Sequence, residues 1–167
     1  MRERNASLPG NQPPPDVLQA LSLAAACAKR GELEGAIVHM KEVLGAVPDH
    51  EIANGMLAGI YAELKMPERA TARYERVLVA NPRNVLARFQ LGLLQLTGGR
   101  PQEALETLAP NLSDNTEFLA HFYSALALLE LGKPGEARVL LQQAAQRMPA
   151  DHPLYPQLQG LLERRGS

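Results

Sequence analysis

Apolar residues recur along most of the chain at the spacing of amphipathic α-helices. Residues 51–64 and 68–80 each carry apolar side chains three and four positions apart, which places them on one face of a helix. Pro67 stands at the start of the second stretch, and Asn81-Pro82 follows its end. Proline is favoured in the first turn of a helix and stops a helix that runs into it. We therefore expect two antiparallel helices joined by a short turn.

This two-helix pattern repeats along the chain. Four alanines mark the period, because Ala36, Ala70, Ala104 and Ala137 are separated by 34, 34 and 33 residues. Further positions keep the same intervals: Leu23, Leu57, Leu91 and Ser124; Ala24, Ala58, Gly92 and Ala125; Met40, Tyr74, Leu108 and Leu141; and, with one repeat skipped, Pro48, Pro82 and Pro149. A period of this length is typical of α-helical repeat proteins.

The periodicity predicts an all-α solenoid of four helix pairs within a single domain, 16–167. The pairs are expected at about 17–50, 51–84, 85–117 and 118–151. Short links containing glycine or proline join the helices, which makes neighbouring helices antiparallel. A last amphipathic stretch, 153–165, is expected to form a helix that caps the apolar end of the final repeat.

The repeated residues resemble the tetratricopeptide repeat family, whose unit follows the pattern W-x2-L-G-x2-Y, then A-x3-F, then P. The second repeat matches this pattern best, through Leu57-Ala58, Tyr61, Ala70, Tyr74 and Pro82. The resemblance covers roughly residues 16–151. It implies a right-handed α-solenoid that serves as a protein–protein interaction module, and it implies that the first helix of each pair lines a concave surface.

Two features depart from the family pattern. The tryptophan position is occupied instead by Ala20, Asn54, Arg88 and His121. In the third repeat the second helix meets Pro110 after about two turns, so we expect a short helix and a local distortion. Asp114 and Glu117 have the spacing of a capping box, which predicts that the next helix begins near Asn115.

The net charge and the N-terminal segment narrow the possible classes of protein. The 17 basic residues balance 18 acidic ones, so the net charge of -1 does not favour nucleic acid as a partner. No apolar stretch is long enough to span a membrane, and the N-terminus has no apolar signal-peptide core, so we expect a cytoplasmic protein without direct membrane insertion. Residues 1–15 include Pro13-Pro14-Pro15 and are expected to be a disordered tail.

The sequence predicts no catalytic site, metal site or cofactor, and we expect no enzyme activity. The four histidines lie in different repeats, and no pair has the spacing that places two imidazoles on one helix face. Cys27 occupies the position of Tyr61 one repeat earlier, so we expect it to be buried as a small apolar residue. Ser124 stands in a leucine column, which indicates packing and not catalysis.

The family resemblance places one face of each first helix on the concave surface. That face is almost entirely apolar here: Leu21 and Ala25; Ile52, Gly55, Gly59 and Ala62; Leu86, Phe89, Leu93 and Leu96; Leu119, Phe122, Leu126 and Leu129. Family members that clamp the acidic tails of heat-shock chaperones carry Lys, Arg and Asn at such positions, so a carboxylate clamp is not expected. Phe89 and Phe122 are predicted to face the groove as aromatic contacts for a bound segment.

An exposed apolar groove needs something to cover it. The leading interpretation is an adaptor or chaperone that holds an apolar or amphipathic segment of another protein. Two alternatives remain open: the N-terminal tail or the end helices fill the groove, or two copies dimerise through it. A further alternative site is the row Arg69, Arg73 and Arg76, which is either a basic patch or an ordinary solvated face.

Overall fold

A computed structural model describes residues 15–113 and 118–164 of the 167-residue chain. Within these residues the chain is all-α. The helices are α1 (Pro15–Lys29), α2 (Leu33–Ala46), α3 (Glu51–Glu63), α4 (Pro67–Ala80), α5 (Val85–Thr97), α6 (Pro101–Leu108), a 3-10 helix η1 (Ala109–Ser113), α7 (Phe118–Glu130), α8 (Pro134–Ala145) and α9 (Tyr155–Glu163). Of the predicted tail 1–15, residues 1–14 lie outside the described residues, and Pro15 is the first residue of α1. The predicted cap at Asp114 and Glu117 also lies outside them.

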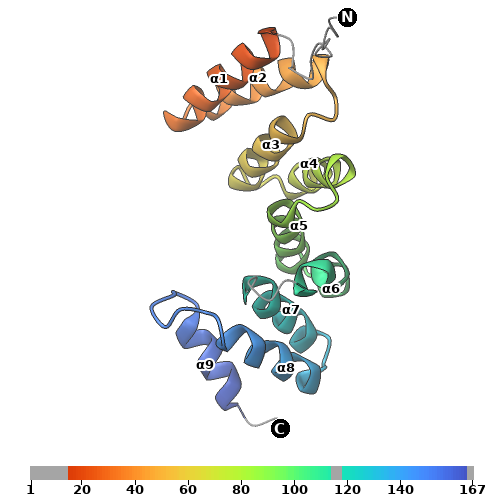
Figure 1. Cartoon of the computed structure of the whole chain (residues 1–167), viewed down its shortest axis with the longest axis vertical. Coiled ribbons are helices and arrows are strands. Elements are labelled where there is room, and N and C mark those ends of the chain that lie inside the picture. Colours follow the sequence, from red (N-terminus) through yellow and green to blue (C-terminus); the bar gives the residue numbers. More distant parts are fainter. Residues whose placement is uncertain (1–14, 114–117, 165–167) are drawn as a thin grey trace, which may run out of the picture.

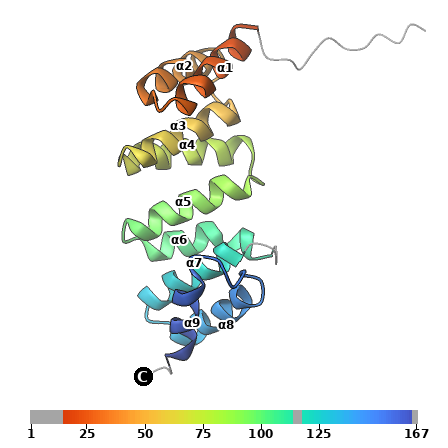
Figure 2. The ribbon, with the colours of Figure 1, turned by 90° about the vertical axis from the view of Figure 1, so that its left-hand side faces the viewer.

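The helices form a stack of antiparallel pairs. Each odd-numbered helix from α1 to α7 packs on the helix that follows it, and each pair packs on the next through the contacts of α2 with α3, α4 with α5 and α6 with α7. The pairs follow one another from one end of the molecule to the other (Figure 2). The first helices α3, α5 and α7 lie on one side of the stack, and α4 and α6 lie on the other (Figure 1). This arrangement confirms the predicted α-solenoid.

The repeated small residues lie where two helices of a pair cross. The alanines at 36, 70, 104 and 137 are fully buried. Gly92 lies so close to Leu108 of the partner helix that a Cβ on Gly92 would stand 2.6 Å from Cγ of Leu108. Leu23 is an exception within its column, because it is 44% exposed. No described helix precedes α1, so Leu23 lacks the neighbour that buries Leu57 and Leu91.

Each first helix ends in the same hydrogen-bonded motif. In the second repeat the amide of Lys65 donates to the carbonyl of Ala62, and the amide of Met66 donates to that of Tyr61. The residues equivalent to Lys65 are Gly31, Gly99 and Gly132, and all four have positive φ, between 58° and 75°. This is the Schellman motif, whose left-handed residue is usually glycine. The repeated turn gives every pair the same sharp reversal.

The third repeat is distorted as predicted. Its second helix, α6, spans only 8 residues and continues as the 3-10 helix η1, which contains Pro110. Asn111 of η1 is buried, and its Nδ2 donates to the carbonyl of Val85 at 3.1 Å. This bond ties the irregular segment back to the start of α5.

The C-terminal segment folds back over the last pair. Phe122 of α7, Met148 and Leu158 of α9 belong to one buried cluster. The ring of His152, in the link before α9, contacts the ring of Phe118 edge-on with 5.3 Å between the centroids. The link and α9 therefore close the end of the solenoid, as a capping helix does.

Candidate functional site

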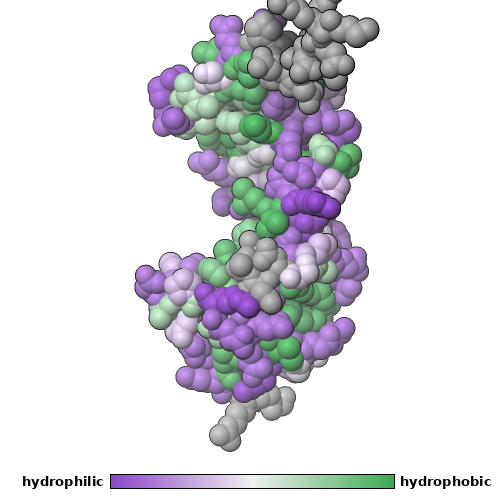
Figure 3. Space-filling model, viewed as in Figure 1, coloured by the Kyte–Doolittle hydropathy of each residue, from purple (hydrophilic) through white to green (hydrophobic). Residues whose placement is uncertain are grey.

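The concave side exposes two large aliphatic side chains in the second and third repeats. Ile52 of α3 is 61% exposed and Leu86 of α5 is 67% exposed. They occupy equivalent places 34 residues apart, and both line one pocket. The molecule is hollowed at its middle on this side, with apolar atoms at the edge of the hollow (Figure 3). This hollow is the candidate site.

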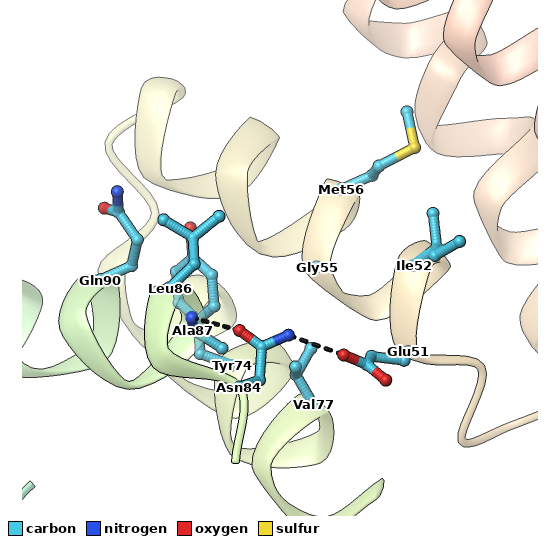
Figure 4. A pocket seen from close by; sticks show the side chains of 10 residues that line it. All are labelled: Glu51, Ile52, Gly55, Met56, Tyr74, Val77, Asn84, Leu86, Ala87 and Gln90. Carbon is cyan, nitrogen blue, oxygen red and sulfur yellow. Dashed lines mark hydrogen bonds between the residues drawn. The ribbon is translucent and has the colours of Figure 1, made fainter. Parts of the chain in front are cut away.

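The pocket lies between α3, α4 and α5 and has a volume of about 230 Å³. Its floor contains buried residues, among them Tyr74 and Val77 of α4 and Ala87 of α5. Ile52 and Leu86 stand on opposite sides, and Met56 and Gln90 extend the two walls one turn further along α3 and α5 (Figure 4). The pocket is therefore an apolar slot between two walls that belong to successive repeats.

One end of the slot is polar and rigidly held. Oε1 of Glu51 accepts hydrogen bonds from Nδ2 of Asn81 at 3.0 Å and from Nδ2 of Asn84 at 2.7 Å. Oδ1 of Asn84 accepts from the backbone amide of Ala87 at 2.8 Å, which caps the start of α5. These bonds join the second repeat to the third, and they leave Oε2 of Glu51 without a hydrogen bond to any described residue. The slot thus ends in a fixed carboxylate.

Gly55 and Gly59 lie on α3 along the groove and leave this wall without side chains at two positions. A Cβ on Gly55 would stand 3.9 Å from Val77, and a Cβ on Gly59 would stand 4.0 Å from the hydroxyl of Tyr74. These are ordinary contact distances, so packing inside the repeat does not require glycine at either position. Burial raises the pKa of Tyr74, because its phenolate would lose hydration beneath this wall.

The prediction that Phe122 lies open in the groove is wrong. Phe122 has no exposed surface, since it packs in the cluster that also contains Leu158 of the capping helix. Leu96 is also buried, at 7% exposure, in a cluster with Ala104 and Ala127. The end helix thus helps to bury Phe122, whereas Leu119, Leu126 and Leu129 of the same repeat stay partly exposed. The most exposed predicted groove side chains, Ile52 and Leu86, belong to the second and third repeats.

The remaining predicted groove residues form its partly buried surface. Gly59 is exposed, and the others have intermediate exposure: Leu21, Ala25, Gly55, Ala62, Phe89, Leu93, Leu119, Leu126 and Leu129. Phe89 contacts Tyr123 edge-on, with 5.5 Å between the ring centroids. Sequence reasoning missed Tyr123, and it missed the polar end formed by Glu51 and Asn84. Asn84 carried a signal, because an Asn two residues after a proline and before an apolar run is a typical helix N-cap.

The histidines and the cysteine have local structural contacts. Nδ1 of His50 accepts from the amide of Ala53 at 3.3 Å and caps α3, and Nδ1 of His152 accepts from the amide of Leu154 at 3.2 Å. Cys27 is buried, as predicted. In the two described segments, no group of three or more His, Cys, Asp or Glu side chains could hold a metal ion, and no helix is long and apolar enough to cross a membrane.

Comparisons with known proteins agree with the helix pairs. Models of the tetratricopeptide repeat match residues 61–109 and 119–143. No curated protein sequence matches the chain.

Several solved structures share the fold. MamA (residues 41 to the end) from Desulfovibrio magneticus RS-1 superposes with a TM-score of 0.80 at 19% identity, over 89% of this chain and 84% of that one. YrrB, described as "a TPR protein with an unusual peptide-binding site", gives a TM-score of 0.74 at 20% identity, over 81% and 70%. MamA of MSR-1 gives 0.69 at 25% identity, over 78% and 75%.

Proposed function

We propose that this chain, which tetratricopeptide repeat models match over residues 61–109 and 119–143, is a non-enzymatic adaptor or chaperone that binds an apolar or amphipathic segment of another protein. The observation that carries this proposal is the pair Ile52 and Leu86, which stand exposed on either side of the slot. Exposed aliphatic side chains that face each other across a preformed pocket are typical of a peptide-binding groove. YrrB, a structural neighbour with a peptide-binding site, supports this interpretation.

The slot suits one kind of occupant. Its apolar walls fit one or two large aliphatic or aromatic side chains, and about 230 Å³ is room for little more. The carboxylate of Glu51 at the polar end suits a positive charge or an N–H group next to those side chains. We therefore expect the bound segment to carry an apolar anchor with a Lys or Arg close to it.

The position of the slot limits what else can cover it. The capping helix α9 packs in the cluster that buries Phe122 of the fourth repeat, and Ile52 and Leu86 remain exposed. A second copy of the chain could also place an apolar side chain in the slot. That occupant would make the protein a groove-mediated dimer, so the test includes the oligomeric state.

A peptide selection tests the proposal. A phage library of random peptides is selected on the intact chain. The affinity of each recovered peptide is then measured by fluorescence anisotropy for the intact chain and for the variants Ile52→Glu and Leu86→Glu. Val79→Glu and Val139→Glu are matched controls, because both valines are exposed aliphatic residues that do not line the slot.

We expect peptides with an apolar anchor beside a basic residue, and affinity losses of at least about 2 kcal/mol in the slot variants only. Recovery of no peptide, or equal binding by slot and control variants, contradicts the proposal. Light scattering on the same samples separates the occupants. A dimer that dissociates in Ile52→Glu would favour self-association through the slot.

A further inference from the structure

Four cations surround a second hollow between α2 and α4. This hollow has a volume of about 510 Å³ and, like the slot, is built by two successive repeats. Its lining combines the row of arginines noted in the sequence with a lysine from the preceding repeat and two uncharged residues: Lys41, Tyr61, Arg69, Ala72, Arg73 and Arg76. We call it the cationic hollow. None of its residues lines the slot.

The two sites use different faces of α4. Tyr74 and Val77 point from α4 into the slot, whereas Arg69, Arg73 and Arg76 follow one another at i, i+4 and i+7 along another face. The sequence shows only three arginines on a helix. The structure adds Lys41 across the hollow, so positive charge comes from both walls.

The positive charge is largely uncompensated. Of the four cations of the hollow, only Arg76 forms an ion pair with a described residue, Asp49, at 3.2 Å, and both side chains of that pair are more than half exposed. Nη1 of Arg73 donates to the amide oxygen of Asn54 at 3.1 Å, which holds the guanidinium without neutralising it. The guanidinium of Arg69 lies 5.7 Å from the centroid of the Tyr61 ring. Like charges held close together repel each other, and an anion in the hollow would relieve that repulsion.

The spacing of the cations favours an acidic peptide. Arg69, Arg73 and Arg76 span about 10 Å along the helix axis, with steps of about 6 and 4.5 Å. Alternate side chains of an extended peptide are about 6.6 Å apart, so two carboxylates at alternate positions match the step of about 6 Å from Arg69 to Arg73. A single phosphate group would meet only part of the row. Tyr61 is buried and offers no face for stacking a base, and the chain is close to neutral overall.

We propose that the cationic hollow binds an acidic segment of a partner protein, in which carboxylate side chains alternate along an extended chain. This surface is separate from the slot, and the inference does not depend on the proposed function of the groove. A partner could engage both surfaces, with an apolar anchor in one and acidic residues in the other.

The test uses a short fluorescein-labelled peptide in which Glu alternates with Ser, and the same peptide with Gln in place of Glu. Binding to the intact chain is measured by anisotropy at low and at high salt. The variant is Lys41→Gln with Arg69→Gln, which removes two cations and spares Arg73 and its bond to Asn54. The control is Arg138→Gln with Arg147→Gln, which makes the same charge change on exposed residues outside the hollow. Circular dichroism checks that both variants fold.

We expect the Glu peptide to bind the intact chain, to lose about ten-fold in affinity with the double variant, and to change less than about two-fold with the control. Binding should also weaken as salt rises from about 0.05 to 0.5 M. Equal binding of the Gln peptide, or equal losses in variant and control, would overturn the proposal. Tighter binding of a single-stranded RNA of similar length would overturn it as well, in favour of a nucleic-acid site.

Discussion

Asn54 and Arg88 stand at equivalent positions of successive repeats, and each donates a hydrogen bond to the carbonyl of the proline six residues before it. Nδ2 of Asn54 donates to the carbonyl of Pro48 at 3.1 Å, and Nη2 of Arg88 donates to that of Pro82. The tetratricopeptide pattern has tryptophan at this position. In this chain, hydrogen bonds from two chemically different side chains tie the link between repeats to the first helix.

Asn54 and Arg88 each form a second hydrogen bond, which joins the first helix of the repeat to the segment that follows it. Asn54 on α3 accepts from Nη1 of Arg73 on α4, and Arg88 on α5 donates from Nη1 to Asn111 on η1. An arginine therefore pairs with an asparagine in both repeats. In the second repeat the asparagine is on the first helix, and in the third repeat the arginine is on the first helix. Polar pairs replace the packing that a tryptophan provides.

Replacing Asn54 by Ala should lower the free energy of unfolding by about 1–3 kcal/mol, because buried polar groups lose their partners. Chemical denaturation measures the change. Gln142→Ala is the control, since Gln142 is exposed and makes no side-chain hydrogen bond with described residues, and it should change stability by less than about 0.5 kcal/mol. Similar stabilities for the two variants would show that the Asn54 bonds contribute little.

Replacing Lys65 by Gly should raise the free energy of unfolding by about 0.5–1 kcal/mol. Lys65 has φ of 58°, a left-handed conformation that costs energy for any residue with a Cβ. The three equivalent positions are already glycine. Lys65→Ala keeps the strain and serves as the control. Denaturant midpoints that rank Ala above Gly would contradict the argument.

Gly92→Ala should destabilise the protein by about 1–3 kcal/mol, because the new methyl group would overlap Leu108 of the facing helix. Gly45→Ala is the matched control. Gly45 lies within α2, and a Cβ at this position would meet nothing within 4 Å, so its substitution should stabilise by about 0.5–1 kcal/mol through helix propensity alone. Thermal melts of both variants compare the two effects. Stabilisation by Gly92→Ala, as expected for Gly45→Ala, would mean that the crossing at Gly92 is not tightly packed.

The stability at alkaline pH should depend on Tyr74. Burial raises the pKa of Tyr74 in the folded state above its ordinary value of 10.0, so the unfolded chain loses this proton first. The stabilising contribution is fully present below pH 10 and declines as pH rises through the folded pKa. Tyr74→Phe has no such proton and should show a shallower loss of stability between about pH 9 and 11. Parallel pH profiles for the two proteins would contradict this assignment.

The repeat period made the helices predictable from sequence. Ala36 and its three equivalents are small and regularly spaced because each one meets a facing helix, and burial confirms this role. Pro110 indicated the shortened α6 for a local reason, since a proline beyond the first turn interrupts a helix. The buried alanines and the shortened α6 were predictable because each depends only on residues within one repeat.

Phe122 shows where the period misleads. It is equivalent to Phe89 in sequence, yet Phe122 is buried because the capping helix folds back over the fourth repeat, and nothing comparable covers the third among the described residues. The cationic hollow was only partly visible, since Lys41 joins the arginines through contact between repeats. Surfaces between repeats and at the ends of the solenoid depend on neighbours that the repeat pattern does not encode.

Entry of a partner segment into the slot between Ile52 and Leu86 can be observed by methyl NMR on the selectively labelled protein, titrated with a peptide recovered by selection. We expect the methyl signals of Ile52, Leu86 and Met56 to shift together as the slot fills, while those of Val79 and Val139 stay in place. Unchanged signals for Ile52 and Leu86 at saturating peptide, with shifts elsewhere, would contradict this expectation.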